Sequence, residues 1–186
     1  KGRFFVNNER HLSGEEEKAE TTFHDAQRLM SAGRFEEARA LLQPPLEQTP
    51  DSVDALYMSA VCERYLKRPD KAAALLKTLK TVSPDFGRAF QEEGHLARDA
   101  GKRDQALSAY AQAVRANPGL EASWRGQEQI LRAMGRDAEA AQAKVQAERL
   151  AALPRELLAA TQLLFRRSDV LQQHAKQRRL RPRDAL

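Results

Sequence analysis

The chain has very few of the residues that build disulfides, metal sites or catalytic centres. Its 186 residues include one cysteine and four scattered histidines, which lack the spacing of metal ligands. Cys62 excludes an internal disulfide, and its neighbours Val61 and Leu66 mark it as a small core residue. A glycine-rich phosphate loop is also missing. We therefore expect no metal, no cofactor and no enzyme active site.

Long apolar runs and strand-forming residues are equally scarce. No window of about 18 apolar residues occurs, so we expect no membrane-spanning segment. The opening "KGRFFVNNERHLSGEEEKAE" lacks the apolar region of a secretory signal, and a cytoplasmic location is expected. Ala, Leu, Glu, Gln, Arg and Lys dominate while β-branched residues are few, a composition that favours helices.

The formal net charge of +5 is confined to one end of the chain. Residues 155–186 contain eight Lys or Arg and three Asp or Glu, so the preceding residues are formally neutral. The basic tail consists of Lys176, Arg178, Arg179, Arg181 and Arg183. It is either a solvated tail or a contact for nucleic acid, an anionic membrane surface or an acidic partner. Since it lacks interleaved aromatic residues, nucleic-acid binding would use phosphates alone and is the less expected.

In the rest of the sequence, several residues recur at a constant interval of 34 positions. The recurring residues are Pro50, Pro84 and Pro118; Ala38, Ala72, Ala106 and Ala140; and Gly33, Gly101 and Gly135, with Lys67 in the remaining slot. Each unit has the pattern of two helices separated by a glycine that suits a left-handed helix end. A hairpin of this size cannot bury its apolar stripe alone, so neighbouring units must stack.

The unit resembles the tetratricopeptide repeat, most clearly in its third copy. That copy carries Phe90, Gly94, Ala106, Tyr110, Ala113 and Pro118 at the pattern positions. Small residues at Gly94 and Ala106 would let two helices approach closely. The fourth copy departs from the pattern, with Glu128 at the small position and Lys144 at the aromatic one.

The resemblance implies an all-α, right-handed superhelical solenoid of antiparallel helix–turn–helix repeats. The repeats are expected at 19–52, 53–86, 87–120 and 121–152, after an N-terminal appendage at 1–18. Residues 153–186 would supply a C-terminal capping helix followed by the basic tail. Pro44 and Pro45 fall inside the second helix of the first repeat, which they should kink or split.

In this family the first helices of successive repeats line a concave groove that holds peptides or partner proteins. The matching positions here are Phe23, Gln27 and Met30; Tyr57, Val61 and Arg64; Arg88, Gln91, His95 and Arg98; and Arg125, Gln129 and Arg132. The arginines would form a positive wall beside an aromatic end, which suits an acidic peptide. The alternative is that these arginines are solvated or paired with Glu and Asp one turn away. Of the positions that clamp a chaperone's terminal carboxylate, only Arg88 carries a suitable residue, so such a clamp is rejected.

The expected function is therefore a non-catalytic scaffold for a protein or peptide partner. Arrays of this style also precede catalytic domains in larger bacterial proteins, including sulfotransferases. A regulatory or substrate-positioning portion of such an enzyme is the alternative from a different class.

Overall fold

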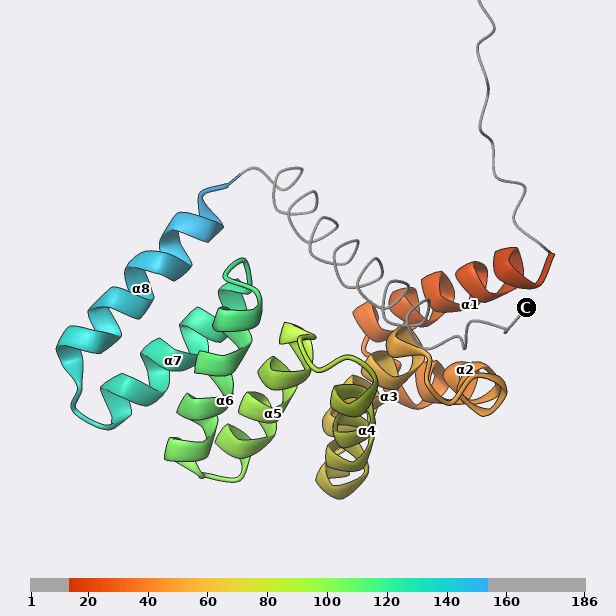
Figure 1. Ribbon diagram of the computed structural model, residues 1–186, viewed down its shortest axis with the longest axis horizontal. Helices are drawn as coiled ribbons and strands as arrows, with labels where there is room; N and C mark the ends of the chain where they lie inside the picture. The colour runs from red at the N-terminus through yellow and green to blue at the C-terminus, as the bar shows by residue number, and fades with distance from the viewer. Residues whose placement is uncertain (1–13, 154–186) are drawn as a thin grey trace, which may run out of the picture.

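The computed structural model describes residues 14–153, with side chains from residue 21 onward. These residues form eight α-helices and no β-strand (Figure 1). The helices are α1 (Gly14–Ser31), α2 (Phe35–Gln48), α3 (Val53–Tyr65), α4 (Pro69–Val82), α5 (Gly87–Asp99), α6 (Arg103–Ala116), α7 (Glu121–Ala133) and α8 (Asp137–Ala151).

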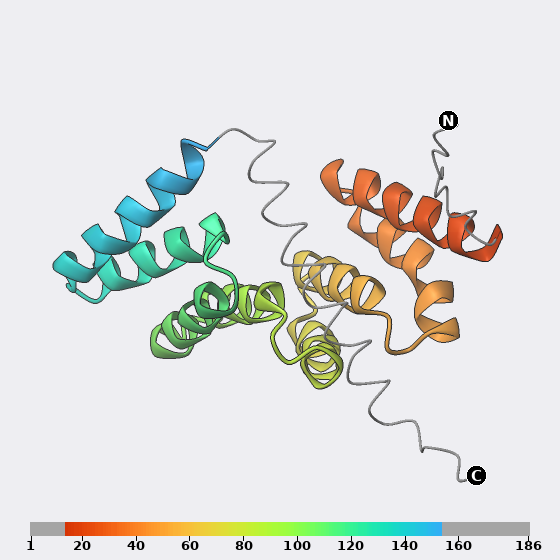
Figure 2. The same ribbon diagram turned by 45° about the horizontal axis from the view of Figure 1, so that its top comes forward.

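The helices pack as four successive hairpins, α1–α2, α3–α4, α5–α6 and α7–α8. Consecutive first helices also touch one another, α1 with α3, α3 with α5 and α5 with α7, whereas successive second helices make no comparable contact. The first helices are thus the inner layer of a curved array, and Figure 2 shows the hairpins following one another along an arc. The expected all-α helical repeat solenoid is confirmed.

The turn inside each hairpin requires one residue with positive φ. Gly33, Gly101 and Gly135 adopt φ values of 75°, 73° and 72°, and Lys67 occupies the same place at 60°. The amide that follows each turn residue bonds a carbonyl of the preceding helix, as Lys102 does to Ala97 at 2.9 Å. The left-handed residue therefore ends the first helix and satisfies its last carbonyls.

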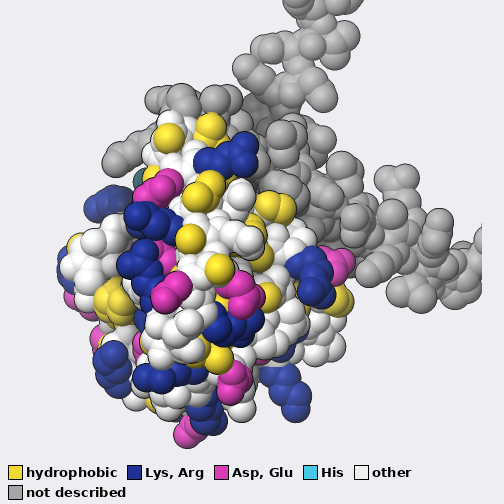
Figure 3. Space-filling model, turned by 90° about the vertical axis from the view of Figure 1, so that its left-hand side faces the viewer, with side chains coloured by type: hydrophobic (Ala, Val, Ile, Leu, Met, Phe, Trp, Pro, Cys, Tyr) yellow, Lys and Arg dark blue, Asp and Glu magenta, His cyan; other side chains and the backbone are white. Residues whose placement is uncertain are grey.

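In the first three repeats, a large side chain from the middle of the second helix lies in the core of the repeat. Leu42, Leu76 and Tyr110 occupy this position with no exposed surface. In the fourth repeat Lys144 replaces them, 47% exposed and 3.5 Å from the carboxylate of Glu148. Charged side chains of both signs are interspersed over this end of the molecule in Figure 3. A polar outer face is what a terminal repeat needs.

Tyr110 is held between two glycines. A Cβ added at Gly94 would lie 2.5 Å from the ring, and one added at Gly126 would lie 2.5 Å from its other side. The small residue at position 94 therefore makes room for an aromatic ring, as well as for the approach of helices α5 and α6. Gly126, which sequence reasoning did not single out, does the same from α7.

Of the expected kink or split at Pro44 and Pro45, the split does not occur, because α2 runs continuously from Phe35 to Gln48. Proline removes only its own amide donor, and the bond from Thr49 N–H to the Pro45 carbonyl at 2.9 Å continues the pattern beyond. Fully buried Leu42 anchors the same helix in the core.

Both ends of the expected organisation reach beyond the described residues. Helix α1 begins at Gly14, before the repeat boundary expected at residue 19. Residues 1–13 of the appendage, the capping helix and the basic tail lie outside the described part.

Candidate functional site

The inner face of the arc is formed by α1, α3, α5 and α7, and it carries the side chains expected to contact a partner. At its N-terminal end Phe23 and Met30 pack against the core cluster of the first repeat, while Gln27 is exposed. Tyr57 contacts the Phe86 ring edge-on at a centroid distance of 5.5 Å. The Arg88 guanidinium lies 5.8 Å from the Tyr57 ring centroid. The expected aromatic end is thus partly built into the core.

Arg64 is a buried structural residue and not a free cation. Its Nε donates to Glu92 Oε2 at 2.6 Å, and the two side chains are 11% and 5% exposed. Burial raises the pKa of Glu92, and the charge of Arg64 opposes that shift. The pair joins α3 to α5 across two repeats. Removing either partner would leave an uncompensated charge in the interior.

His95 adds no positive charge to this face at neutral pH. Its Nδ1 lies 2.7 Å from the Tyr110 hydroxyl, with the two rings edge-on at 5.4 Å. Burial lowers the pKa of His95 to about 4, helped by the nearby charges of Arg64 and Arg98. Burial also raises the pKa of Tyr110 to about 12. The hydrogen bond therefore joins two neutral groups and fixes the Tyr110 ring.

The remaining arginines of α5 and α7 form ion pairs at the surface. Arg98 lies 3.0 Å from Asp99, Arg125 lies 2.6 Å from Glu121, and Arg132 lies 3.0 Å from Glu128. The three arginine side chains are 36%, 51% and 58% exposed, respectively. Exposed pairs contribute only about 0–1 kcal/mol, so a ligand carboxylate can compete for Arg98 and Arg125, and less readily for Arg132, whose partner Glu128 is only 16% exposed.

Polar contacts also connect α5 to α7. The Ser123 hydroxyl, which is completely buried, donates to the Gln91 side-chain oxygen at 3.1 Å. Gln91 is therefore held in place, whereas Gln129 is exposed. Neither Ser123 nor Glu92 was expected as an internal residue. The available signal was that Glu92 stands where the second and fourth repeats carry Met58 and Gly126, and Ser123 where the second and third carry Ala55 and Ala89.

Chemistry other than binding finds no support among the described residues. Burial raises the pKa of the Cys62 thiol to about 12, which makes it a poor nucleophile. No group of three or more His, Cys, Asp or Glu side chains in residues 14–153 is arranged to hold a metal ion. Among the described helices, none combines the length and apolarity needed to span a bilayer.

Comparison with known proteins agrees with this architecture. The family model described as tetratricopeptide repeat matches residues 29–91. TTC0263, a thermophilic TPR protein in Thermus thermophilus, has 24% identity and a TM-score of 0.63, with 89% of this chain and 92% of that chain covered. A crystal structure of MamA has 18% identity and a TM-score of 0.61, with 71% and 77% covered.

MamA from Desulfovibrio magneticus RS-1 has 17% identity and a TM-score of 0.59, covering 71% of this chain and 75% of that one. A comparison with curated protein sequences finds no significant match. The solved structures share the fold with this chain. Together with the family match over residues 29–91, the four stacked hairpins support a tetratricopeptide repeat protein.

Proposed function

We propose that the protein is a non-catalytic scaffold that binds an acidic peptide segment of a partner protein along the inner face of α3, α5 and α7. Tetratricopeptide repeat proteins generally serve as protein-interaction scaffolds, and this chain shares their architecture. The acidic preference and the location of the binding site are the specific parts of this proposal.

The observation that supports it is the set of exposed arginines Arg98, Arg125 and Arg132. Each forms an ion pair with a neighbouring carboxylate on its own helix. A guanidinium offers a planar fork of donors that matches a carboxylate, so an acidic side chain can replace or share the present partner. Exchanging one exposed carboxylate for another costs little, whereas buried Arg64 is not free to exchange.

On this proposal the expected contact residues have three roles. Arg64, Gln91 and His95 maintain the shape of the face through contacts with Glu92, Ser123 and Tyr110. Arg98, Arg125 and Arg132, with exposed Gln27 and Gln129, are available to a ligand. Phe23, Tyr57 and Arg88 would contact an apolar side chain at the N-terminal end of the peptide.

Selection from a random peptide display library on the immobilised full chain tests this proposal. We expect the selected peptides to be enriched in Asp and Glu. Their recovery should fall on a variant in which Arg98, Arg125 and Arg132 are all changed to Ala.

The matched control changes three exposed cations of the second helices to Ala, namely Lys77, Arg115 and Arg149. It removes the same charge from elsewhere on the array and should retain the peptides. Equal loss of peptide recovery on both variants would show that binding depends only on net charge. Enrichment of peptides without acidic residues would refute the proposed preference.

A further inference from the structure

On the outer side of the array, each junction between two repeats is formed by four equivalent positions. Two belong to the second helix of one repeat, one to the first helix of the next repeat, and one to the turn that follows that helix. At the first junction these positions form an ionic cluster. Arg68 lies 3.2 Å from Glu36 and 3.6 Å from Glu63, and Arg39 lies 3.3 Å from Glu36. Charged side chains therefore occupy the space between α2, α3 and α4.

The third junction has apolar side chains in the same register. Leu107 and Leu131 stand two repeats after Arg39 and Glu63, and Leu107 packs against the core cluster that contains Leu131. The outer two positions are Asp104 and Arg136; the hydrogen bond to Glu139 raises the pKa of Arg136, and the charge of Asp104 adds to that shift. Leucines thus occupy the space that the ionic cluster occupies at the first junction.

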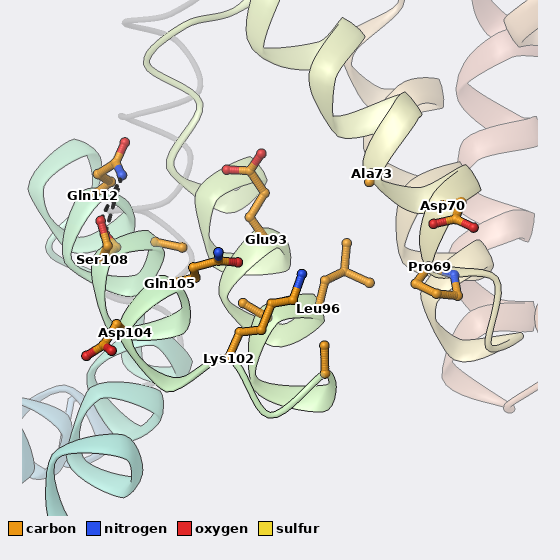
Figure 4. A pocket seen from close by; sticks show the side chains of 13 residues that line it. Pro69, Asp70, Ala73, Glu93, Leu96, Lys102, Asp104, Gln105, Ser108 and Gln112 are labelled. Atoms are coloured by element: carbon orange, nitrogen blue, oxygen red, sulfur yellow. Dashed lines mark hydrogen bonds between the residues drawn. The ribbon is translucent and has the colours of Figure 1, made fainter. Parts of the chain in front are cut away.

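The second junction is unfilled. Its two central positions are Ala73 and Ala97, and here the structure contains a cavity of about 630 Å³ between α4, α5 and α6. Figure 4 shows Asp70 and Ala73 on one wall, Gln105 and Ser108 on the other, and Leu96 between them. We call this cavity the junction groove. Helix α4 also packs less extensively on α5 than α2 does on α3 or α6 on α7.

We propose that the junction groove is the docking site for the chain's own basic tail, with Leu180 between Ala73 and Ala97. The third junction shows that leucine side chains fit this place in the repeat. In the tail Leu180 stands in "RRLRPR", so cations flank the one leucine on both sides.

The charges of the groove and tail are complementary. Asp70, Glu93 and Asp104 line the groove against a single cation, Lys102. Glu93 forms an ion pair with Lys80, with Oε1 and Nζ 2.5 Å apart, whereas Asp70 has no ion pair within the described residues. The tail carries five cations between residues 176 and 183 and no acid. Because the rest of the chain is formally neutral, no other segment offers a comparable excess of positive charge.

The length of the chain beyond α8 allows this contact. The segment that connects Leu153, the last described residue, to Leu180 covers positions 154–179. A segment of that length reaches up to about 90 Å when fully extended. Packed helices are about 10 Å apart, which places the groove beside α6 on the order of 20–30 Å from α8. A docked tail would join the two halves of the array at their least packed junction.

Distance measurement between two nitroxide spin labels on the full chain tests this proposal. Labels at Thr78→Cys on α4 and Ala185→Cys beyond the docking segment avoid the groove itself, and Cys62 is too buried to react. We expect a short, narrow distance distribution. It should become long and broad in the Ala73→Leu/Ala97→Leu variant and in Leu180→Ser, and should weaken in high salt.

The matched control is Ala74→Leu, which adds the same side chain to an exposed position of α4 outside the groove. It should keep the short distance. The filled variant should stay folded, since the third junction already has leucines at these positions, and its melting temperature checks this. A broad distribution in the parent chain, or a narrow one that survives filling, would overturn the proposal. A short distance between singly labelled copies would assign the groove to a second molecule and overturn the intramolecular contact.

Discussion

Adding one methyl group to α7 tests how the third and fourth repeats pack. In Gly126→Ala the new Cβ would lie 2.5 Å from Tyr110 Cζ, well inside van der Waals contact. Tyr110 cannot move aside, because it is completely buried, Gly94 contacts its opposite edge, and His95 holds its hydroxyl. Helices α6 and α7 must therefore move apart, or the Tyr110 ring must leave its position between the two glycines.

The expected net effect combines two opposing contributions. Overpacking a filled core costs about 1–3 kcal/mol, whereas Gly to Ala inside a helix gains about 1 kcal/mol. With the ring clamped on both sides, we expect destabilisation near the upper end of the difference, about 1–2 kcal/mol. In a Tyr110→Leu background, which copies Leu76 of the second repeat, the clash is absent and Gly126→Ala should stabilise by up to about 1 kcal/mol.

Urea unfolding of the four proteins in this double-mutant cycle gives the coupling free energy directly. A change of sign between the two backgrounds supports the packing described for Tyr110. The reasoning is refuted if Gly126→Ala stabilises the parent protein, or if its effect is the same in both backgrounds.

Three further outcomes follow from individual contacts. Lys67→Gly should raise stability by about 1 kcal/mol by relieving a left-handed backbone, and Gly101→Ala should lower it by a similar amount, both read from melting temperatures. Arg64→Ala should cost about 3–5 kcal/mol in urea unfolding because it leaves a buried carboxylate unpaired, whereas Arg125→Ala should cost less than about 1 kcal/mol. His95 has a pKa of about 4 in the folded protein, below its ordinary value, so the unfolded chain binds the proton more readily. The free energy of unfolding should therefore fall by up to about 3 kcal/mol as the pH is lowered from 6.5 to 4. The His95→Gln variant should lack this part of the pH dependence.

The repeat period in the sequence predicted most of the fold. The constant interval between repeats placed the helix-ending residue at Gly33, Gly101 and Gly135, and it also marked Lys67, which takes the same positive φ without being glycine. Local rules left a kink and a split open at Pro44 and Pro45, because a general penalty for proline says nothing about the tertiary contacts that keep α2 continuous.

The candidate site was harder to predict, because helix position shows which way a residue faces but not which residue it contacts. Arg64 and Arg125 look alike in the sequence, yet one is buried against Glu92 of the next repeat and the other pairs with Glu121 on its own helix. A pair between repeats and a pair within one helical turn have opposite consequences for ligand binding. Only the packing of α3 against α5 separates them.

The affinity of one selected acidic peptide for the full chain tests the proposed function most directly. Titration calorimetry would compare the parent protein with the Arg98/Arg125/Arg132→Ala variant and with the Lys77/Arg115/Arg149→Ala control. We predict at least tenfold weaker binding for the first variant, equivalent to about 1.4 kcal/mol, and an unchanged dissociation constant for the control. Equal affinity for the parent protein and the first variant would contradict a binding face on α5 and α7.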